Sequence, residues 1–216
     1  SFTERKHLIT IGNFLHAPNL DSVIYLKKYI WPKLRAKLKN VELHVFGSYA
    51  NDYAKQLQNE NDNFFIQGFT PDVDMIMKNA KICISPLRFG AGLKGKFFDA
   101  MKNGTPFITT SIGAEGILDP KQIYNFVTDD ASIMIDHIVQ LYTSEELWSL
   151  QQSLGFSILS EKFNKSIHLD KFAYRLNQII ESRHEHRLSN FTGLMLQHHM
   201  MQSTMYMSRW IEEKNK

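Results

Sequence analysis

Short apolar segments alternate with longer segments of helical periodicity up to about position 145. The short segments are rich in β-branched and aromatic residues, and those predicted as strands are 8–12, 41–46, 64–66, 81–85, 106–110 and a weaker one at 124–127. The segments predicted as helices are 19–30, 50–59, 71–79, 93–103 and 130–142. Parallel strands need crossover connections, which are usually helical. The alternation therefore predicts an α/β fold, a doubly wound parallel sheet of about six strands covered by helices on both faces.

From Ser144 onward the strand pattern ceases, and only helices are predicted. These are 145–163, 166–183 and a Met-rich segment at 191–214. The division predicted is a domain of alternating strands and helices at 1–143 and C-terminal helices at 144–216 that complete or extend it. The apolar side of the last helix, which includes Met201, Met205 and Trp210, needs a partner surface. That surface belongs to this domain, to a second domain, or to another copy in a homodimer.

Composition narrows the class of partner. The 216 residues carry a net charge of +3, which is too small to indicate nucleic acid but suits an anionic small ligand. Cys83, the only cysteine, lies in an apolar run and predicts a buried thiol in a reducing compartment. No segment reaches the roughly 18 apolar residues of a spanning helix, and no signal peptide is visible. We expect a cytoplasmic protein, with peripheral contact at the inner membrane face as an alternative.

The segment PLRFGAGLKGKFFDAM, residues 86–101, combines glycines with basic residues. Phe97 follows Gly95-Lys96 where a P-loop needs Ser or Thr to hold magnesium, which argues against a nucleoside triphosphatase. Two interpretations stay open. The glycines either let a loop pack closely on the sheet, or they leave backbone N–H groups free at a helix start, as a cradle for phosphate.

Three basic residues in this segment, Arg88, Lys94 and Lys96, favour the phosphate cradle. Cations are disfavoured at the N-terminus of a helix, and a bound anion removes the conflict. Asp99, in the first turns of the same helix, either accepts hydrogen bonds from a ribose diol or is a solvated acid. A second glycine-bearing loop, 109–116, follows the next strand. Both loops are expected at the carboxyl edge of the sheet, where parallel sheets bind ligands.

Several further segments occur in a recognisable order. They are Gly12-Asn13-Phe14-Leu15-His16-Ala17-Pro18-Asn19, Trp31-Pro32, Gly47, Gly68-Phe69 with Asp72-Val73, the 86–96 segment, Ala100-Met101, Gly104 and 109–116. Over about residues 7–142, this order resembles the C-terminal, donor-binding domain of group 1 (GT4-type) glycosyltransferases, which have the GT-B fold. The resemblance implies that residues 1–143 form a Rossmann-like domain, one half of a GT-B fold, that binds a nucleotide-diphosphate sugar, UDP- or GDP-linked. It also implies an N-terminal acceptor-binding half, which we expect to lie outside this sequence.

The resemblance assigns roles to individual residues. Arg88 and Lys94 would be the catalytic residues, because they would stabilise the leaving diphosphate as its charge develops. The donor-binding residues implied are Gly12, Asn13, His16, Gly68, Phe69, Gly90, Ala91, Gly92, Leu93, Lys96, Asp99, Gly113 and Glu115. Among them, Gly68 and Phe69 would meet the nucleobase and Asp99 the ribose hydroxyls. The implied reaction is a retaining, metal-independent transfer of sugar to a glycan, lipid or other acceptor, without a cofactor, in cell-envelope polysaccharide biosynthesis.

Three departures from the family pattern leave an alternative. The first turn lacks the Arg and Lys that many relatives carry, and Gly90 or Ala91 stands where the family's paired-Glu motif has its first acid. Asp99 also replaces the longer Glu. The alternative is therefore a non-catalytic interaction domain with a degenerate donor site. An NAD-dependent domain is a weaker interpretation, because residues 12–17 lack the Gly-x-Gly-x-x-Gly turn.

Overall fold

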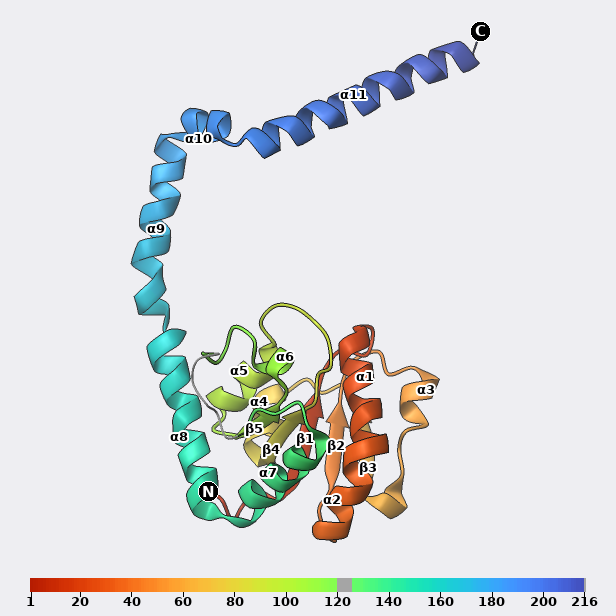
Figure 1. Ribbon diagram of the computed structural model, residues 1–216, viewed down its shortest axis with the longest axis vertical. Helices are drawn as coiled ribbons and strands as arrows, with labels where there is room; N and C mark the ends of the chain where they lie inside the picture. The colour runs from red at the N-terminus through yellow and green to blue at the C-terminus, as the bar shows by residue number, and fades with distance from the viewer. Residues whose placement is uncertain (120–125, 216) are drawn as a thin grey trace. The chain divides into compact units, whose positions relative to one another are not determined.

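The computed structural model describes residues 1–119 and 126–215, which fall into two compact units, Ser1–Phe163 and Asn164–Lys216. The strands of unit 1 are β1 (His7–Ile11), β2 (Leu43–Phe46), β3 (Phe64–Gly68), β4 (Ala80–Ser85) and β5 (Phe107–Thr109) (Figure 1). Its helices are α1 (Ala17–Tyr25), η1 (Leu26–Ile30), α2 (Trp31–Lys37), α3 (Asp52–Lys55), η2 (Glu60–Asp62), α4 (Val73–Asn79), α5 (Gly95–Lys102), α6 (Ser111–Ala114), α7 (Ala131–Thr143) and α8 (Glu145–Lys162). Unit 2 holds α9 (Lys165–Glu181), α10 (Arg183–Ser189) and α11 (Phe191–Lys214).

The sheet is parallel throughout, in the order β3-β2-β1-β4-β5. This confirms the doubly wound α/β fold but corrects the strand number, because the described residues form five strands rather than six. The predicted strand 124–127 lies partly outside the described residues, and Val127 makes only an isolated parallel bridge to Thr109. The edge available for a sixth strand is short, because the chain leaves β5 at Thr110 to cap α6 through its hydroxyl.

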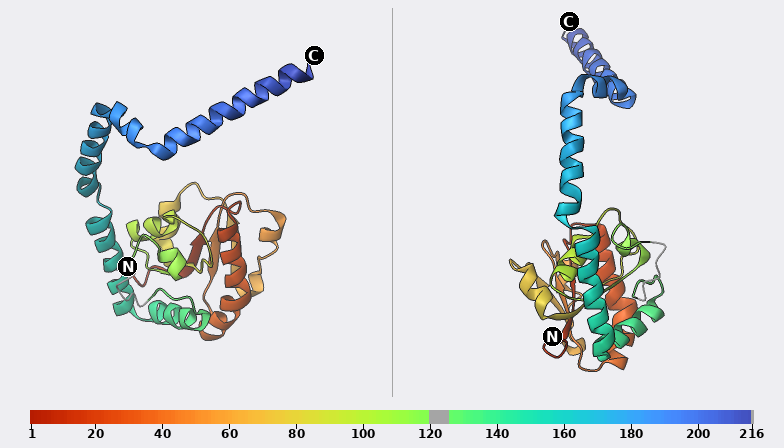
Figure 2. Two further views of the ribbon diagram at one scale, coloured as in Figure 1. Left: turned by 45° about the horizontal axis from the view of Figure 1, so that its top comes forward. Right: turned by 90° about the vertical axis from the view of Figure 1, so that its left-hand side faces the viewer.

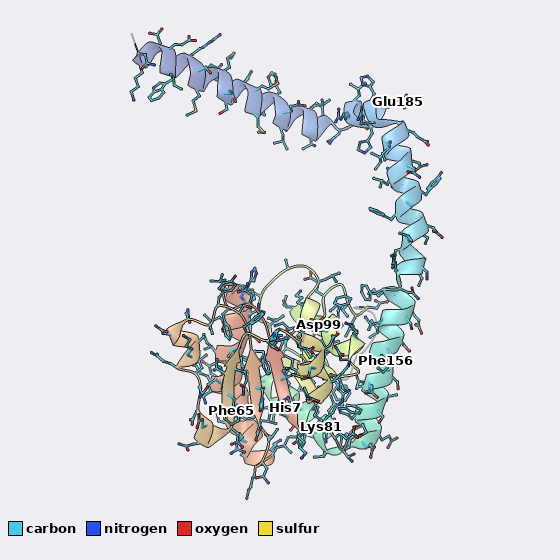
Figure 3. All side chains as sticks on the ribbon, turned by 180° about the vertical axis from the view of Figure 1, so that it is seen from behind. His7, Phe65, Lys81, Asp99, Phe156 and Glu185 are labelled. Carbon is cyan, nitrogen blue, oxygen red and sulfur yellow. The ribbon has the colours of Figure 1, made fainter. Side chains whose placement is uncertain are left out.

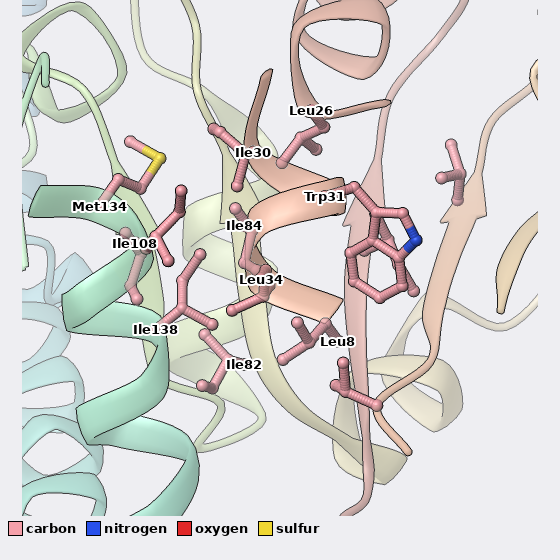
Figure 4. Close-up of a cluster of buried hydrophobic side chains, with 14 of the residues drawn as sticks. Leu8, Leu26, Ile30, Trp31, Leu34, Ile82, Ile84, Ile108, Met134 and Ile138 are labelled. Atoms are coloured by element: carbon pink, nitrogen blue, oxygen red, sulfur yellow. The ribbon is translucent and has the colours of Figure 1, made fainter. Parts of the chain in front are cut away.

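Helices cover both faces of the sheet (Figures 1 and 2). On one face, β-strand residues such as Leu8 and Ile84 pack against α1, α2 and α7, with Trp31 fully buried among them (Figure 4). On the other face, Ile9 and Cys83 pack against α4 and α5. Cys83 is buried and free, as the sequence predicts, and burial raises the pKa of its thiol to about 12.

The predicted helix 19–30 continues through Pro32 to Lys37 by way of a π-helical turn. Proline has no N–H to donate and its ring clashes with the preceding turn, so it breaks a regular α-helix. Here Pro32 stands in the first turn of α2, and the Trp31 N–H donates to Leu26 O across the wider π turn of η1. The predicted helix 50–59 is shorter than expected, since only the four residues of α3, capped by Asn51, form a helix within this range, and the 3₁₀ turn η2 follows it.

Helix α8 completes the core of unit 1. Trp148 is 1% exposed, donates its indole N–H to Lys81 O at 2.7 Å and meets the Phe2 ring edge-on. Gly155 allows close approach to α5, since a Cβ at this position would lie 3.2 Å from Met101 Cγ. The face of α8 beyond Gly155 continues the packing with Ile158 and Leu159.

The described residues of unit 2 form three helices without a buried residue. Large apolar side chains are exposed along them, including Phe172, Ile180, Met201 and Trp210. Within the described residues, no helix is both long enough and apolar enough to cross a membrane.

Candidate functional site

The glycine-bearing loop between β4 and α5 builds one wall of the site. All six residues of β4 are buried, and the chain then leaves the sheet at Pro86. Gly90 and Gly92 have φ values of +133° and +75°, which side chains other than that of glycine rarely tolerate. A Cβ at Gly92 would meet nothing within 4 Å, so backbone conformation rather than space requires glycine there. The glycines therefore shape the loop and do more than allow packing.

Helix α5 begins without the groups that normally satisfy the first backbone N–H groups of a helix. Its N-cap residue is Lys94, which makes no side-chain cap, and its first turn has no acid. In contrast, α4 is capped by Asp72, α7 by Asp130 and α8 by Ser144. An uncapped helix start with positive partial charge is a site for an anion.

A cavity of about 610 Å³ lies against this helix start. Its walls come from the β1–α1 loop on one side and from the β4–α5 loop with the start of α5 on the other. The residues that line it are Ile11, Gly12, Asn13, His16, Pro18, Asn19, Leu87, Phe89, Gly90, Ala91, Leu93, Lys94, Gly95, Lys96 and Asp99. The fold thus brings nine of the predicted site residues to one cavity: Gly12, Asn13, His16, Gly90, Ala91, Leu93, Lys94, Lys96 and Asp99.

Two lysines give the cavity positive charge. The Lys94 side chain is only 9% exposed, and its ammonium lies 3.3 Å from a carboxylate oxygen of Glu115. Lys96 is partly buried and donates to Asn19 Oδ1 at 2.9 Å and to Ser85 Oγ at 3.1 Å. Desolvation lowers the pKa of Lys96 to about 8. Removal of water from an ammonium without a charged partner disfavours its protonated form.

Asn19 links Lys96 to the β1–α1 loop. Its amide N–H donates to Asn13 O at 2.9 Å, while its carbonyl accepts from Lys96. Gly12 makes room for this side chain, because a Cβ at position 12 would lie 2.5 Å from Asn19 Cγ. The loop, the end of β4 and α5 are therefore held together by one polar network.

Asp99 lines the same cavity, about one helical turn after Lys96 on α5. Figure 3 shows it away from His7, the residue at which β1 begins. Desolvation, with a smaller contribution from the Asp74 carboxylate, raises the pKa of Asp99. A half-buried carboxylate at a cavity wall can accept hydrogen bonds from hydroxyl groups of a ligand.

The structure places Arg88 in a neighbouring cavity of about 260 Å³, not in the cavity of Lys94. Its guanidinium donates to both carboxylate oxygens of Asp21 and lies 5.0 Å from the centre of the Tyr25 ring. The predicted contact of Arg88 with a diphosphate stays a prediction.

The remaining predicted residues do not line the main cavity. Gly68 is the last residue of β3, two strands away from β1, and Phe69, which follows it, is 71% exposed. Gly92 belongs to the loop without lining the cavity. Gly113 packs on Thr109, where a Cβ would lie 1.8 Å from Oγ1, and Glu115 reaches the site only through Lys94.

The sequence interpretation gave no role to Asn19, Ser85 and Asp21. Asn19 lies in the quoted loop segment, and Ser85 is the last residue of the predicted strand 81–85. A polar residue at the carboxyl end of a buried strand was the available signal for Ser85. For Asp21, whose partner is 67 positions away, the sequence has no such signal.

A family model described as glycosyl transferases group 1 matches residues 5–144, more than half of the chain. The chain is 24% identical over 167 residues to an uncharacterized 44.6 kDa protein in the cps region of Klebsiella pneumoniae, covering 73% of this chain and 42% of the relative. It is 25% identical over 200 residues to poly(glycerol-phosphate) alpha-glucosyltransferase of Bacillus subtilis (strain 168), covering 83% of this chain and 26% of the relative. The chain thus spans less than half of the length of each of these relatives.

Among solved structures, a TarM mutant of S. aureus in complex with fondaparinux, alpha-GlcNAc-glycerol and UDP has a TM-score of 0.65 at 20% identity. The alignment covers 79% of this chain and 35% of TarM. A likeness at this identity shows the fold alone, and it confirms the predicted Rossmann-like α/β fold.

Proposed function

Because the chain belongs to the group 1 glycosyltransferases, we propose that unit 1 binds a nucleotide-diphosphate sugar and supplies the donor half of a sugar-transfer site. The observation that carries the proposal is the uncapped start of α5, which faces a cavity together with Lys94 and Lys96. In this assignment the diphosphate lies against the loop amides and the two lysines, and Asp99 binds the ribose.

Sugar transfer breaks the bond between the anomeric carbon and a phosphate oxygen, and negative charge then develops on the leaving diphosphate. Fixed donors and cations placed at that charge lower the barrier. We assign this role to Lys94 and to the amides at the start of α5, with Arg88 as a further cation. We propose a retaining transfer in which these groups act in place of a metal ion.

The base and the acceptor are proposed from the relatives. TarM is crystallised with UDP and an alpha-GlcNAc-glycerol compound, and the Bacillus relative is a poly(glycerol-phosphate) glucosyltransferase. We therefore propose a UDP-linked donor and a cell-envelope polymer as acceptor. The acceptor would be held by a second, N-terminal domain, since the chain spans only part of its relatives.

Calorimetric titration of the chain with UDP and, separately, with GDP tests donor binding. UDP is expected to bind, and Lys94→Met is expected to weaken it by about tenfold to a hundredfold, because a hydrogen bond to a charged group contributes about 1.5–3 kcal/mol. Lys102→Met is the matched control. Lys102 is an exposed lysine of the same helix that pairs with Asp74 outside the cavity, so its loss should leave affinity unchanged.

A folded chain that binds neither nucleotide at millimolar concentration would reject the donor-site assignment. It would favour the alternative of an interaction domain with a degenerate site. If Lys94→Met and Lys102→Met lost the same amount of UDP affinity, binding would depend only on general electrostatic attraction.

A further inference from the structure

The ammonium of Lys96 is held by neutral oxygens alone. Its two partners are the Asn19 amide and the Ser85 hydroxyl, and no carboxylate among the described residues lies within ion-pair distance of it. The ammonium also borders the cavity assigned to the donor. The site thus contains a desolvated amine with strong hydrogen-bond acceptors but without a counter-charge.

The groups around Lys96 do not supply that charge. On β4, the Cys83 thiol beneath it is fully buried, and burial keeps this thiol protonated by raising its pKa to about 12. On α5 and its preceding loop, Asp99 and Lys94 line the same wall of the cavity, and the carboxylate nearest to Lys94 is that of Glu115. On the β1–α1 loop, His16 faces the cavity, and on α1 Asp21 is engaged by Arg88.

We propose that binding of a nucleoside diphosphate brings Lys96 to its protonated form, so that donor binding takes up a proton and weakens at alkaline pH. The inference rests on the proposed function, since it names a property of the same site. A phosphate oxygen would be the missing anionic neighbour of the ammonium, and an opposite charge within a few ångströms favours the charged form of an amine.

The direction of the effect follows from the pKa of Lys96, which is about 8 in the unliganded protein and would be raised by the ligand. Well below pH 8 the amine is already charged, so Lys96 takes up almost no proton on binding there. Well above pH 8 the amine of the free protein is neutral, and each pH unit costs up to about tenfold in affinity until the pKa of the complex is reached. A phosphate group whose second pKa is about 6 is ionised above pH 8, where the uptake is expected.

The test is calorimetric titration of the chain with UDP between pH 6.5 and 9.5, in buffer pairs that differ in ionisation enthalpy. The dependence of the observed enthalpy on the buffer measures the number of protons taken up. We expect a value near zero at pH 6.5, rising toward one proton above pH 8. Lys96→Arg keeps a permanent cation and should bind UDP without proton uptake. Cys83→Ala, which removes the thiol below, and Lys102→Met should keep the uptake of the wild type.

A second measurement keeps the test independent of the variants. Nitrogen NMR of the lysine side chains in the wild-type chain follows the protonation of the Lys96 amine directly. The pH midpoint of that titration should rise when UDP is added. Absence of UDP binding at pH 6.5 would reject the proposed function. Three results would overturn this inference while the donor site stands. They are UDP binding without proton uptake, proton uptake that persists in Lys96→Arg, and a Lys96 titration midpoint that UDP leaves unchanged.

Discussion

The carbonyl oxygen of Gly12 lies where a side chain at position 47 would begin. A Cβ on Gly47 would be 2.1 Å from this oxygen and 2.6 Å from the Phe14 ring, so β1 and β2 end too close together for any other residue. Gly47→Ala is therefore expected to lower the free energy of unfolding by about 1–3 kcal/mol, the usual cost of overpacking. Urea denaturation measures it.

Gly95 is the matched control for this glycine. It is the first residue of α5, and a Cβ there would meet nothing within 4 Å. Gly95→Ala should leave stability unchanged or raise it by up to about 1 kcal/mol, because alanine restricts the unfolded chain. If the two variants were equally stable, the close approach of the two strand ends would not constrain position 47.

At the scale of elements, α8 contacts the sheet through Trp148. The indole is buried, and its N–H satisfies Lys81 O. Trp148→Ala removes this packing and hydrogen bond and should cost about 3–5 kcal/mol in unfolding free energy, as buried aromatic truncations do. Leu150→Ala on the same helix is the control, since Leu150 is 61% exposed and should change stability by less than about 0.5 kcal/mol. A small loss of unfolding free energy in Trp148→Ala would mean that α8 packs on the domain chiefly through its later turns.

For the whole molecule, the question is where the smallest independently folding piece ends. All buried hydrophobic side chains among the described residues precede Phe163, and unit 1 ends at this residue. A chain of residues 1–163 should therefore unfold cooperatively and keep the UDP affinity of the full chain. A chain of residues 1–143 lacks Trp148 and the rest of α8, so it should melt at a lower temperature. Equal melting temperatures for the two pieces would show that the helices beyond 143 extend the domain without completing it.

Much of the fold could be predicted from the sequence, because its signals are local. Alternation of buried strands with helical segments indicated a parallel sheet, and the glycine segment indicated a special loop before α5. The same local view overestimated the strand number, since edge pairing beside β5 depends on where Thr110 turns away. It also extended the helix at 50–59, where only short turns form.

Sequence order and side-chain chemistry by themselves determined the α/β class, the burial of Cys83 and the family. Only the tertiary structure decided which polar groups share a cavity. It placed the Lys96 ammonium against Asn19, 77 positions away. It also paired Arg88 with Asp21, outside the cavity that Lys94 lines. The physical reason is that pairing between distant side chains depends on how strands and helices pack, whereas strand, helix and turn preferences are set by neighbouring residues.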